Sequence, residues 1–387
     1  MPITLGELLQ PQVILDTVSK VSAGKGVLSR FFGMHIGGKN IKTSPSRYAQ
    51  VRVINNTREP ANFRAPGTGP STTPPNPIGL QRVAMARVHE KITLDGELLS
   101  NLATTVGPNS VIDREGQDYI AEQEEFLGQK FNCAVEVMVA GMVQDSLYIV
   151  QSGDKFIPYL SSQAGTQVQI NFQVPSGNKN QLNMLGTGNI IGTPWNNAAA
   201  TIVQDCLNVR KAYVQLTGMQ PKYALLNSST LAYIMQNTEL RTVGGTVQAV
   251  FDSFMYEDTK DKDGYNLAEK GSVRFRALPW LQWVIIDDVL SIGGSDPVYS
   301  TGTGTLTNVI PNDTVIFLPE PDPSWVTMYH GSELISEDRG KPMTLKTGFQ
   351  TWSSHDIEPT RLSIVGLLNA IPFYKREKAV AVATVKF

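Results

Sequence analysis

The sequence predicts an α+β protein in which strand-forming segments accompany one long helix and a compact mixed region. Three observations predict this class: two strand patterns flank a proline-rich stretch over residues 47–91, a long helical pattern begins near Asp113, and strand patterns return after residue 360. With 387 residues, 41% of them apolar, the chain is long enough for one large or two medium hydrophobic cores.

The composition excludes several classes of protein. The 33 basic and 35 acidic residues nearly balance, which disfavours dedicated sequence-specific DNA binding. Cys133 and Cys206 each stand in an apolar helical pattern, which indicates buried thiols in a reducing compartment and not a disulfide framework. The N-terminal segment lacks the pattern of a signal peptide, and no apolar run approaches the roughly 20 residues of a membrane span. We therefore expect a soluble protein without a membrane partner.

The first two segments are predicted to depend on a neighbouring molecule. Residues 1–45 combine one short amphipathic stretch with glycines at 24, 26, 33, 37 and 38, so we expect an arm that rests on something else. Strands are predicted over Tyr48–Ile54 and 80–88, and between them lie six prolines, which exclude both a helix and a central strand. A long two-stranded hairpin is marginal alone in water, so this segment too is expected to lie on a support.

The strongest helical pattern in the chain begins near Asp113. Apolar residues recur at three- and four-residue spacing from Ile120 to Met142, which predicts a long helix. Three glycines inside it, at 116, 128 and 141, indicate a bend or close packing. The alternation in residues 168–174 then predicts a half-buried strand.

A second compact region is predicted over about 195–350. A helical stripe covers 202–216 and is stopped by Gly218 and Pro221, a strand follows at 222–226, and a capped helix covers Ser228–Gln236. A buried strand is predicted at 280–286 and loops at 258–271 and 293–308. The chain ends in strands at 362–368 and 379–383, with a break at Pro372.

No motif predicts catalysis or a cofactor. The four histidines are scattered, at positions 35, 89, 330 and 355, and neither cysteine is near one in sequence. The acidic segment 258–264 matches a calcium loop only in its middle, so a solvated turn is the better interpretation. Asp287 and Asp288 follow a strand, where a turn explains them at least as well as acid–base chemistry. We expect no catalytic, metal or cofactor residues.

One charge asymmetry does predict an interaction. Residues 47–91 hold seven basic and two acidic residues, whereas residues 113–145 hold eight acids and two bases. Either both are solvated faces, or the basic hairpin of one subunit lies across the acidic helix of the next, where opposite charges would set register and association rate. The second hypothesis names the following candidate interface residues: Arg52, Arg58, Arg64, Arg82, Arg87, Glu115, Asp118, Glu122, Glu124 and Glu125.

The order of these elements resembles the Hong Kong 97-type capsid fold, and more closely the lambda-type phage major capsid proteins (capsid protein E family). The resemblance is carried by 311–318 with Tyr329, His330 and Gly331, by the helix and strand of 202–226, and by 366–371 with 380–382. It implies an N-terminal arm (1–45), an extended loop (46–95), a peripheral domain (96–189 with 355–387) whose spine helix covers about 113–145, and an axial domain (190–354).

The resemblance also implies a function. It would make the chain the major capsid protein of a tailed double-stranded DNA phage, assembled in the host cytoplasm into pentamers and hexamers of an icosahedral virion shell. Implied partners are further copies of the chain, a portal protein, a scaffolding protein, in some members a decoration protein, and packaged DNA touched without sequence readout. Two alternatives remain open: an encapsulin-like compartment that encloses cargo protein, and an enzyme with an α+β core, which would show a polar pocket with perturbed pKa values.

Overall fold

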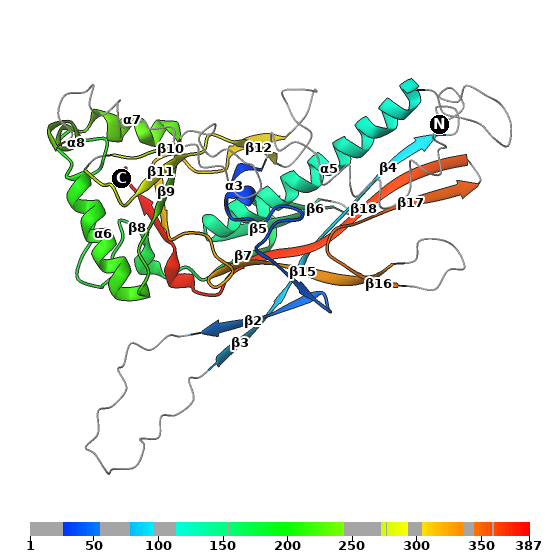
Figure 1. Ribbon diagram of the computed structural model, residues 1–387, viewed down its shortest axis with the longest axis horizontal. Coiled ribbons are helices and arrows are strands. Elements are labelled where there is room, and N and C mark those ends of the chain that lie inside the picture. The colour runs from blue at the N-terminus through cyan, green and yellow to red at the C-terminus, as the bar shows by residue number, and fades with distance from the viewer. Residues whose placement is uncertain are drawn as a thin grey trace, which may run out of the picture.

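The computed structural model describes residues 26–54, 78–95, 114–152, 155–243, 272–275, 277–292, 304–335, 344–357 and 360–387. The main body is elongated, with one long helix crossing a long twisted sheet on one side and a mixed α/β region on the other (Figure 1). A two-stranded hairpin leaves this body at its lower edge. The α+β class predicted from the sequence is confirmed.

The larger sheet is built around one strand of 15 residues near the C-terminus. Its order is β1-β15-β18-β17, with β16 also paired to β15 and β4 paired to β18. Both β4 and β17 run antiparallel to β18 over residues 361–367, so they occupy its two edges there. The bounds of these strands are β1 Ile41–Ser44, β4 Ala86–Asp95, β15 Val326–Ile335, β16 Thr344–Thr347, β17 Gln350–Ile357 and β18 Thr360–Tyr374.

The expected break at Pro372 is wrong, because β18 continues through it to Tyr374. At this position β18 pairs with β15, in register with Met328, whereas the pairing with β4 has already ended at Ala370. A proline removes a backbone donor, and a strand tolerates that loss where one of its sides carries no paired strand. The local sequence could not reveal how far β4 extends.

The long helix predicted near Asp113 is confirmed as α5, Arg114–Val143. It packs on one face of β18 and β4, and its buried side chains form the main core. The approach to β18 is close: a Cβ atom added to Gly366 would lie 2.5 Å from the ring of Phe131. Gly141 likewise faces Leu147 of the next strand at 2.9 Å from an added Cβ, so the predicted close packing at a helix glycine is found there.

Part of the expected N-terminal arm is packed within its own chain. The short helix α3, Val27–Phe31, lies against α5, and Val27, Leu28 and Phe32 are buried in the main core. The carboxylate of Glu136 on α5 accepts the backbone N–H groups of Leu28 and Ser29 at 2.7 and 2.8 Å. For residues 26–44 the prediction of an arm resting on a neighbour is therefore wrong, while residues 1–25 lie outside the described residues.

The second region is a sheet flanked by helices, as predicted. Its strand order is β10-β11-β9-β14-β19-β8, and α6 ends at Gly218 in the left-handed conformation, with φ 74°. Asn227 caps α7 by accepting the N–H of Thr230 at 2.9 Å. The bounds are β8 Lys179–Asn180, α6 Ile202–Thr217, β9 Tyr223–Leu226, α7 Ser228–Gln236, α8 Thr238–Val243, β10 Ser272–Val273, β11 Gln282–Ile285, β14 Thr314–Leu318 and β19 Ala381–Thr384.

Two smaller sheets complete the body, and both correct the sequence prediction. The three strands β6-β5-β7 (β6 Lys155–Tyr159, β5 Ser146–Ser152, β7 Thr166–Asn171) include the strand expected at 168–174, which ends earlier because Gln173 has a φ of 64°. The loop expected at 293–308 is wrong at its end, because β13, Thr305–Asn308, pairs with β12, Val289–Ile292. The expected loop at 258–271 lies outside the described residues.

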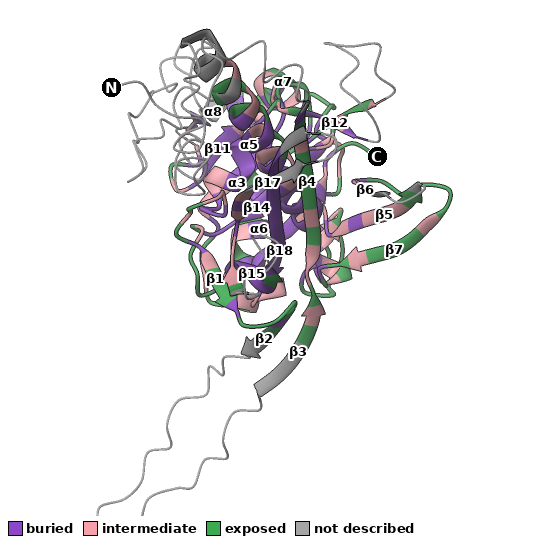
Figure 2. Cartoon of the chain, turned by 90° about the vertical axis from the view of Figure 1, so that its right-hand side faces the viewer, coloured by how far each residue is buried: buried purple, intermediate pink, exposed green. Residues whose placement is uncertain are grey.

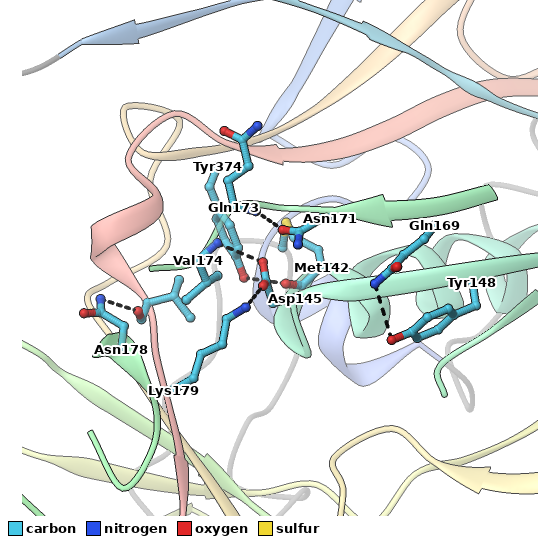
Figure 3. A network of polar contacts seen from close by, with 11 residues as sticks. Met142, Asp145, Tyr148, Gln169, Asn171, Gln173, Val174, Asn178, Lys179 and Tyr374 are labelled. Atoms are coloured by element: carbon cyan, nitrogen blue, oxygen red, sulfur yellow. Dashed lines mark hydrogen bonds and ion pairs between the residues drawn. The ribbon is translucent and has the colours of Figure 1, made fainter. Parts of the chain in front are cut away.

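A polar joint connects the end of α5 to the second region (Figure 3). Asp145, with φ 62°, follows the helix; its carboxylate accepts the Val174 N–H at 2.9 Å and pairs with the ammonium of Lys179 on β8. The Tyr374 hydroxyl donates at 3.2 Å to the carbonyl oxygen of Met142, which also accepts the Asp145 N–H at 3.1 Å, so this acceptor at the helix end is doubly satisfied. The spine helix is thus tied to β18 and to the sheet of the second region.

Candidate self-assembly surface

The predicted hairpin is confirmed at its base. Strand β2, Tyr48–Ile54, pairs antiparallel with β3, Ile78–Ala84, and the pair leaves the body of the chain (Figures 1 and 2). The second predicted strand is divided at Met85, so that β3 belongs to the hairpin and β4 to the large sheet. The guanidinium of Arg82 lies 4.0 Å from the ring centre of Tyr48, which is 43% exposed.

The root of the hairpin, which is the part that contains Ala49, Val83 and Met85, packs on the large sheet. Ala49 is buried in a small apolar cluster with Tyr329, Ile371 and Phe373, and Val83, Met85 and Ile170 pack against this cluster. Successive side chains of a strand point to opposite faces, and Ala370 of β18 belongs to the core beneath α5. The root therefore lies on the face of the sheet opposite to the long helix.

A buried carboxylate also contacts the root. Glu333 on β15 is in contact with Arg47, just before β2, at 2.5 Å, and with Arg87, near the start of β4, at 3.1 Å. Burial alone would raise the pKa of Glu333, but the hydrogen bonds from Asn369 and Arg87 and the nearby arginine charges outweigh it and hold that pKa below its ordinary value. Glu333 therefore remains ionised in the folded chain at neutral pH.

The N-terminal half of α5 presents an exposed face on which two acids precede an aromatic ring. Phe126 is 51% exposed, and the exposed Glu122 and Glu125 precede it by one helical turn and by one residue. Lys130, one turn later, lies over the Phe126 ring at 5.2 Å and 3.8 Å from the carboxylate of Glu90 on β4. Such a face suits a partner that brings both positive charge and apolar surface.

The candidate interface residues differ in their positions. Arg82, Arg87, Glu122 and Glu125 are exposed, whereas Glu124 is buried and does not lie on a solvated face. Arg87, although exposed, is paired with Glu333 within its own chain. Arg58 and Arg64 lie outside the described residues, and for three further candidates only the backbone is described: Arg52 in β2, and Glu115 and Asp118 in α5.

Three acids counted in the charge of the helix segment are used inside the subunit. Glu124, Glu136 and Asp145 are buried. Glu136 caps α3, and Asp145 belongs to the polar joint shown in Figure 3. For Glu124 the helical spacing was a usable signal, because this residue lies on the apolar stripe of the helix, three residues before Leu127. For Glu136 and Asp145 the local sequence carried no such signal. Phe126 was also missed, although an aromatic residue directly after acids and outside the apolar stripe of a helix was a usable signal.

The described residues contain no grouping typical of a catalytic centre. They hold no cluster of three or more His, Cys, Asp or Glu that could bind a metal ion, and neither the buried Cys206 nor the half-buried Cys133 is in a disulfide. Asp287 accepts the backbone N–H of Ser228 at 2.8 Å, so it caps α7, which agrees with the interpretation as a turn residue. Among the helices that the structure describes, none is long and apolar enough to cross a membrane.

Comparison with known proteins identifies the fold. No family model and no curated protein matches the sequence. Among solved structures, the chain is similar to a prophage protein of Escherichia coli CFT073 described as a capsid protein, with a TM-score of 0.54, 10% identity, and coverage of 100% of this chain and 99% of that one.

Two further solved structures are similar over nearly the whole chain. A phage-related protein of Bordetella bronchiseptica RB50 has a TM-score of 0.48 and 11% identity, with 97% and 96% of the two chains covered. The encapsulin SrpI of Synechococcus elongatus PCC 7942 has a TM-score of 0.43 and 10% identity, with 95% and 89% covered. The chain has the α+β fold of Hong Kong 97-type capsid proteins.

Proposed function

We propose that the chain is a major capsid protein of a tailed double-stranded DNA phage, which assembles with copies of itself into the icosahedral shell of the virion. The observation that carries this proposal is the β2–β3 hairpin, which leaves the subunit on a fold shared with a prophage protein described as a capsid protein. A two-stranded hairpin gains little stability alone in water, so a neighbouring subunit is the natural support for its outer part.

The proposal includes partners and an organisation implied by the lambda-type resemblance. Copies of the chain would form pentamers and hexamers in the host cytoplasm, together with a portal protein, a scaffolding protein and packaged DNA bound without sequence readout. Residues 46–95 would be mainly the extended loop, 96–189 with 355–387 mainly the peripheral domain, and 190–354 mainly the axial domain. The exceptions are β4, β15 and β16, which belong to the large sheet beside α5, and β8 and β19, which belong to the sheet of the second region. The described part of the first 45 residues would belong to the body of the subunit, because α3 packs against α5.

An encapsulin-like compartment is the second candidate, since encapsulin SrpI has a similar overall structure. The two functions predict different contents of the particle. A phage shell should contain double-stranded DNA and be closed at one vertex by a different protein, whereas a compartment should contain a co-purifying protein and no nucleic acid. Nucleic-acid absorbance and denaturing electrophoresis of particles purified from the native source would distinguish them, and particles that hold only cargo protein would contradict the phage proposal.

We further propose that the hairpin of one subunit docks on the exposed face of α5 of the next. Arg82 and Tyr48 would bring the positive charge and apolar surface that the face formed by Glu122, Glu125 and Phe126 suits. Opposite charges at such a contact guide register and association rate, while the partly exposed rings of Phe126 and Tyr48 supply apolar area to bury.

Charge reversal tests this contact. Arg82→Glu and Glu125→Arg, each alone, should raise the subunit concentration needed for particle formation, by about tenfold for each 1.4 kcal/mol lost, and the two changes together should restore part of it. Arg210→Glu is the matched control, because the Arg210 guanidinium also lies over an aromatic ring, 4.9 Å from that of Trp280, but on α6 far along the chain. Particle yield would be measured by sedimentation and negative-stain microscopy.

Two outcomes separate the parts of the proposal. Assembly of Arg82→Glu at the wild-type concentration would contradict the docking of hairpin on helix, while the shell function would stand. A wild-type chain that sediments only as a monomer, at every concentration and ionic strength tried, would contradict the shell function itself.

A further inference from the structure

The chain enters and leaves the hairpin close to one buried carboxylate, that of Glu333. Arg47 lies one residue before β2, and Arg87 lies two residues after the Met85 break that ends β3. Across the root, the backbone N–H of Met85 donates to the carbonyl oxygen of Arg47 at 3.1 Å. Glu333, on β15 beneath, is only 7% exposed and contacts both arginines.

The hydrogen bonds of this carboxylate are shared between three side chains. Its Oε1 accepts from the Arg47 guanidinium at 2.5 Å, and its Oε2 accepts from Arg87 Nε at 3.2 Å and from Asn369 Nδ2 at 2.7 Å. Arg87 belongs to β4 and Asn369 to β18, which are paired strands of the large sheet, so the carboxylate joins the residue that precedes β2 to two strands of the sheet below. A charge held by donors from three segments fixes their relative positions more strictly than a single contact would.

The sheet is also shaped to receive the root. A Cβ atom added to Gly331, two residues before Glu333, would lie 2.7 Å from Met85 Sδ, 3.1 Å from the carbonyl oxygen of Ser46 and 3.3 Å from Asn369 Cβ. Ser46 and Met85 are the residues at which the chain enters and leaves the hairpin. The glycine therefore lets the root approach the backbone of β15 closely, next to the carboxylate.

We propose that Glu333 is a positioning residue that fixes the direction in which the β2–β3 hairpin leaves the subunit. The apolar cluster around Ala49 holds the root against the sheet, but apolar contact is non-directional. The two arginine contacts are directional: one holds Arg47, which leads into β2, and the other holds Arg87 of β4, just after the end of β3, so Glu333 fixes the hairpin's entry relative to the sheet. The inference rests on the proposed function for its purpose, because a fixed direction decides which part of a second copy the hairpin reaches.

The test measures direction in the separate subunit, so that it does not depend on assembly. Spin labels at Gln50→Cys on β2 and Leu207→Cys on α6, in a Cys133→Ser background that leaves only the buried Cys206, report the distance from hairpin to body. At concentrations too low for assembly, the spin-labelled chain with Glu333 unchanged should give one narrow distance distribution. Glu333→Gln should lose that narrow distribution and give a broad or shifted one, because the neutral amide cannot hold two guanidinium groups.

The matched control is Glu320→Gln, since Glu320 is exposed and pairs with Lys222 away from the hairpin. It should keep the narrow distribution. If Glu333→Gln fails to fold, as judged by circular dichroism, Arg47→Gln decides the question, because it leaves Glu333 bound to Arg87 and Asn369. Broadening in Arg47→Gln would then support the inference.

A distribution in folded Glu333→Gln as narrow as that of the unmodified root, at the same distance, would overturn the inference. So would an unchanged distribution in Arg47→Gln where Glu333→Gln does not fold. Neither result depends on whether Arg82→Glu impairs assembly. The direction of the hairpin and the place where it docks can therefore fail independently.

Discussion

The buried carboxylate of Glu136 should make the stability of the chain depend on pH. Glu136 lies within the core between α5 and α3, and its burial raises its pKa from 4.5 to about 7, against the opposing effect of the hydrogen bonds from Ser29 and Leu28; Asp288 adds a smaller rise. Burial of the charge thus raises the pKa of Glu136 by more than these hydrogen bonds lower it. The folded chain therefore keeps Glu136 protonated to a higher pH than the unfolded chain does.

The sign and size of the effect follow from this pKa. Because the pKa is higher in the folded chain than in the unfolded one, the contribution of Glu136 to stability is fully present below pH 4.5 and is lost as the pH rises towards about 7. The slope in this window is about 1.4 kcal/mol per pH unit, and the whole loss is about 3 kcal/mol. Above about pH 7, the cost of burying the ionised Glu136 no longer changes with pH.

Glu136→Gln should remove this dependence. The amide cannot ionise, but its NH₂ group faces one of the two backbone N–H groups, at a cost of about 1–3 kcal/mol that does not vary with pH. The wild-type chain should therefore exceed the variant in unfolding free energy by about 3 kcal/mol more at pH 5 than at pH 8. Urea unfolding followed by tryptophan fluorescence measures both values.

An exposed acid provides the control for this prediction. Glu320→Gln, whose carboxylate is exposed next to Lys222, should follow the pH dependence of the wild-type chain. A difference between wild type and Glu136→Gln that stays constant within about 0.5 kcal/mol from pH 5 to pH 8 would refute the reasoning. It would mean that Glu136 keeps an ordinary pKa in spite of its burial.

Two further predictions concern packing and the polar joint. Gly366→Ala should destabilise the chain by about 1–3 kcal/mol in urea unfolding, because its Cβ would meet the ring of Phe131, and Phe131→Leu should recover part of this loss; no recovery in the double variant would contradict the close contact. Asp145→Asn keeps a residue that tolerates positive φ but puts an amide against the Lys179 ammonium, and should cost about 2 kcal/mol in urea unfolding; a loss below about 0.5 kcal/mol would contradict a role for the charge pair.

Much of the fold could be predicted from local patterns in the sequence. The long helix was predicted to within a residue of its start, because apolar side chains recur along it at helical spacing and because the chain from Arg114 to Val143 lacks proline. The end of α6 at Gly218 and the cap of α7 at Asn227 follow from short-range backbone chemistry. In these places a few neighbouring residues decide the conformation.

The errors lie where distant segments decide. Residues 26–44 read as an arm because they hold too few apolar residues for a core of their own, yet α3 completes a core formed mainly by α5. Pro372 read as a break, yet β18 continues because β4 has already ended beside it. The charge excess of the helix segment was counted correctly, but the count could not show that Glu136 and Asp145 point inward.

The amino-acid sequence by itself determined the hairpin strands, the long helix, the helices of the second region and the excess of positive charge in the hairpin, since each depends on residues close together in the chain. Tertiary structure alone decided which charges are exposed. It also brought Arg47 and Arg87 to Glu333, which lies 286 and 246 positions away from them along the chain. The physical reason is that burial and long-range pairing depend on where the chain returns to itself. No local pattern carries that information.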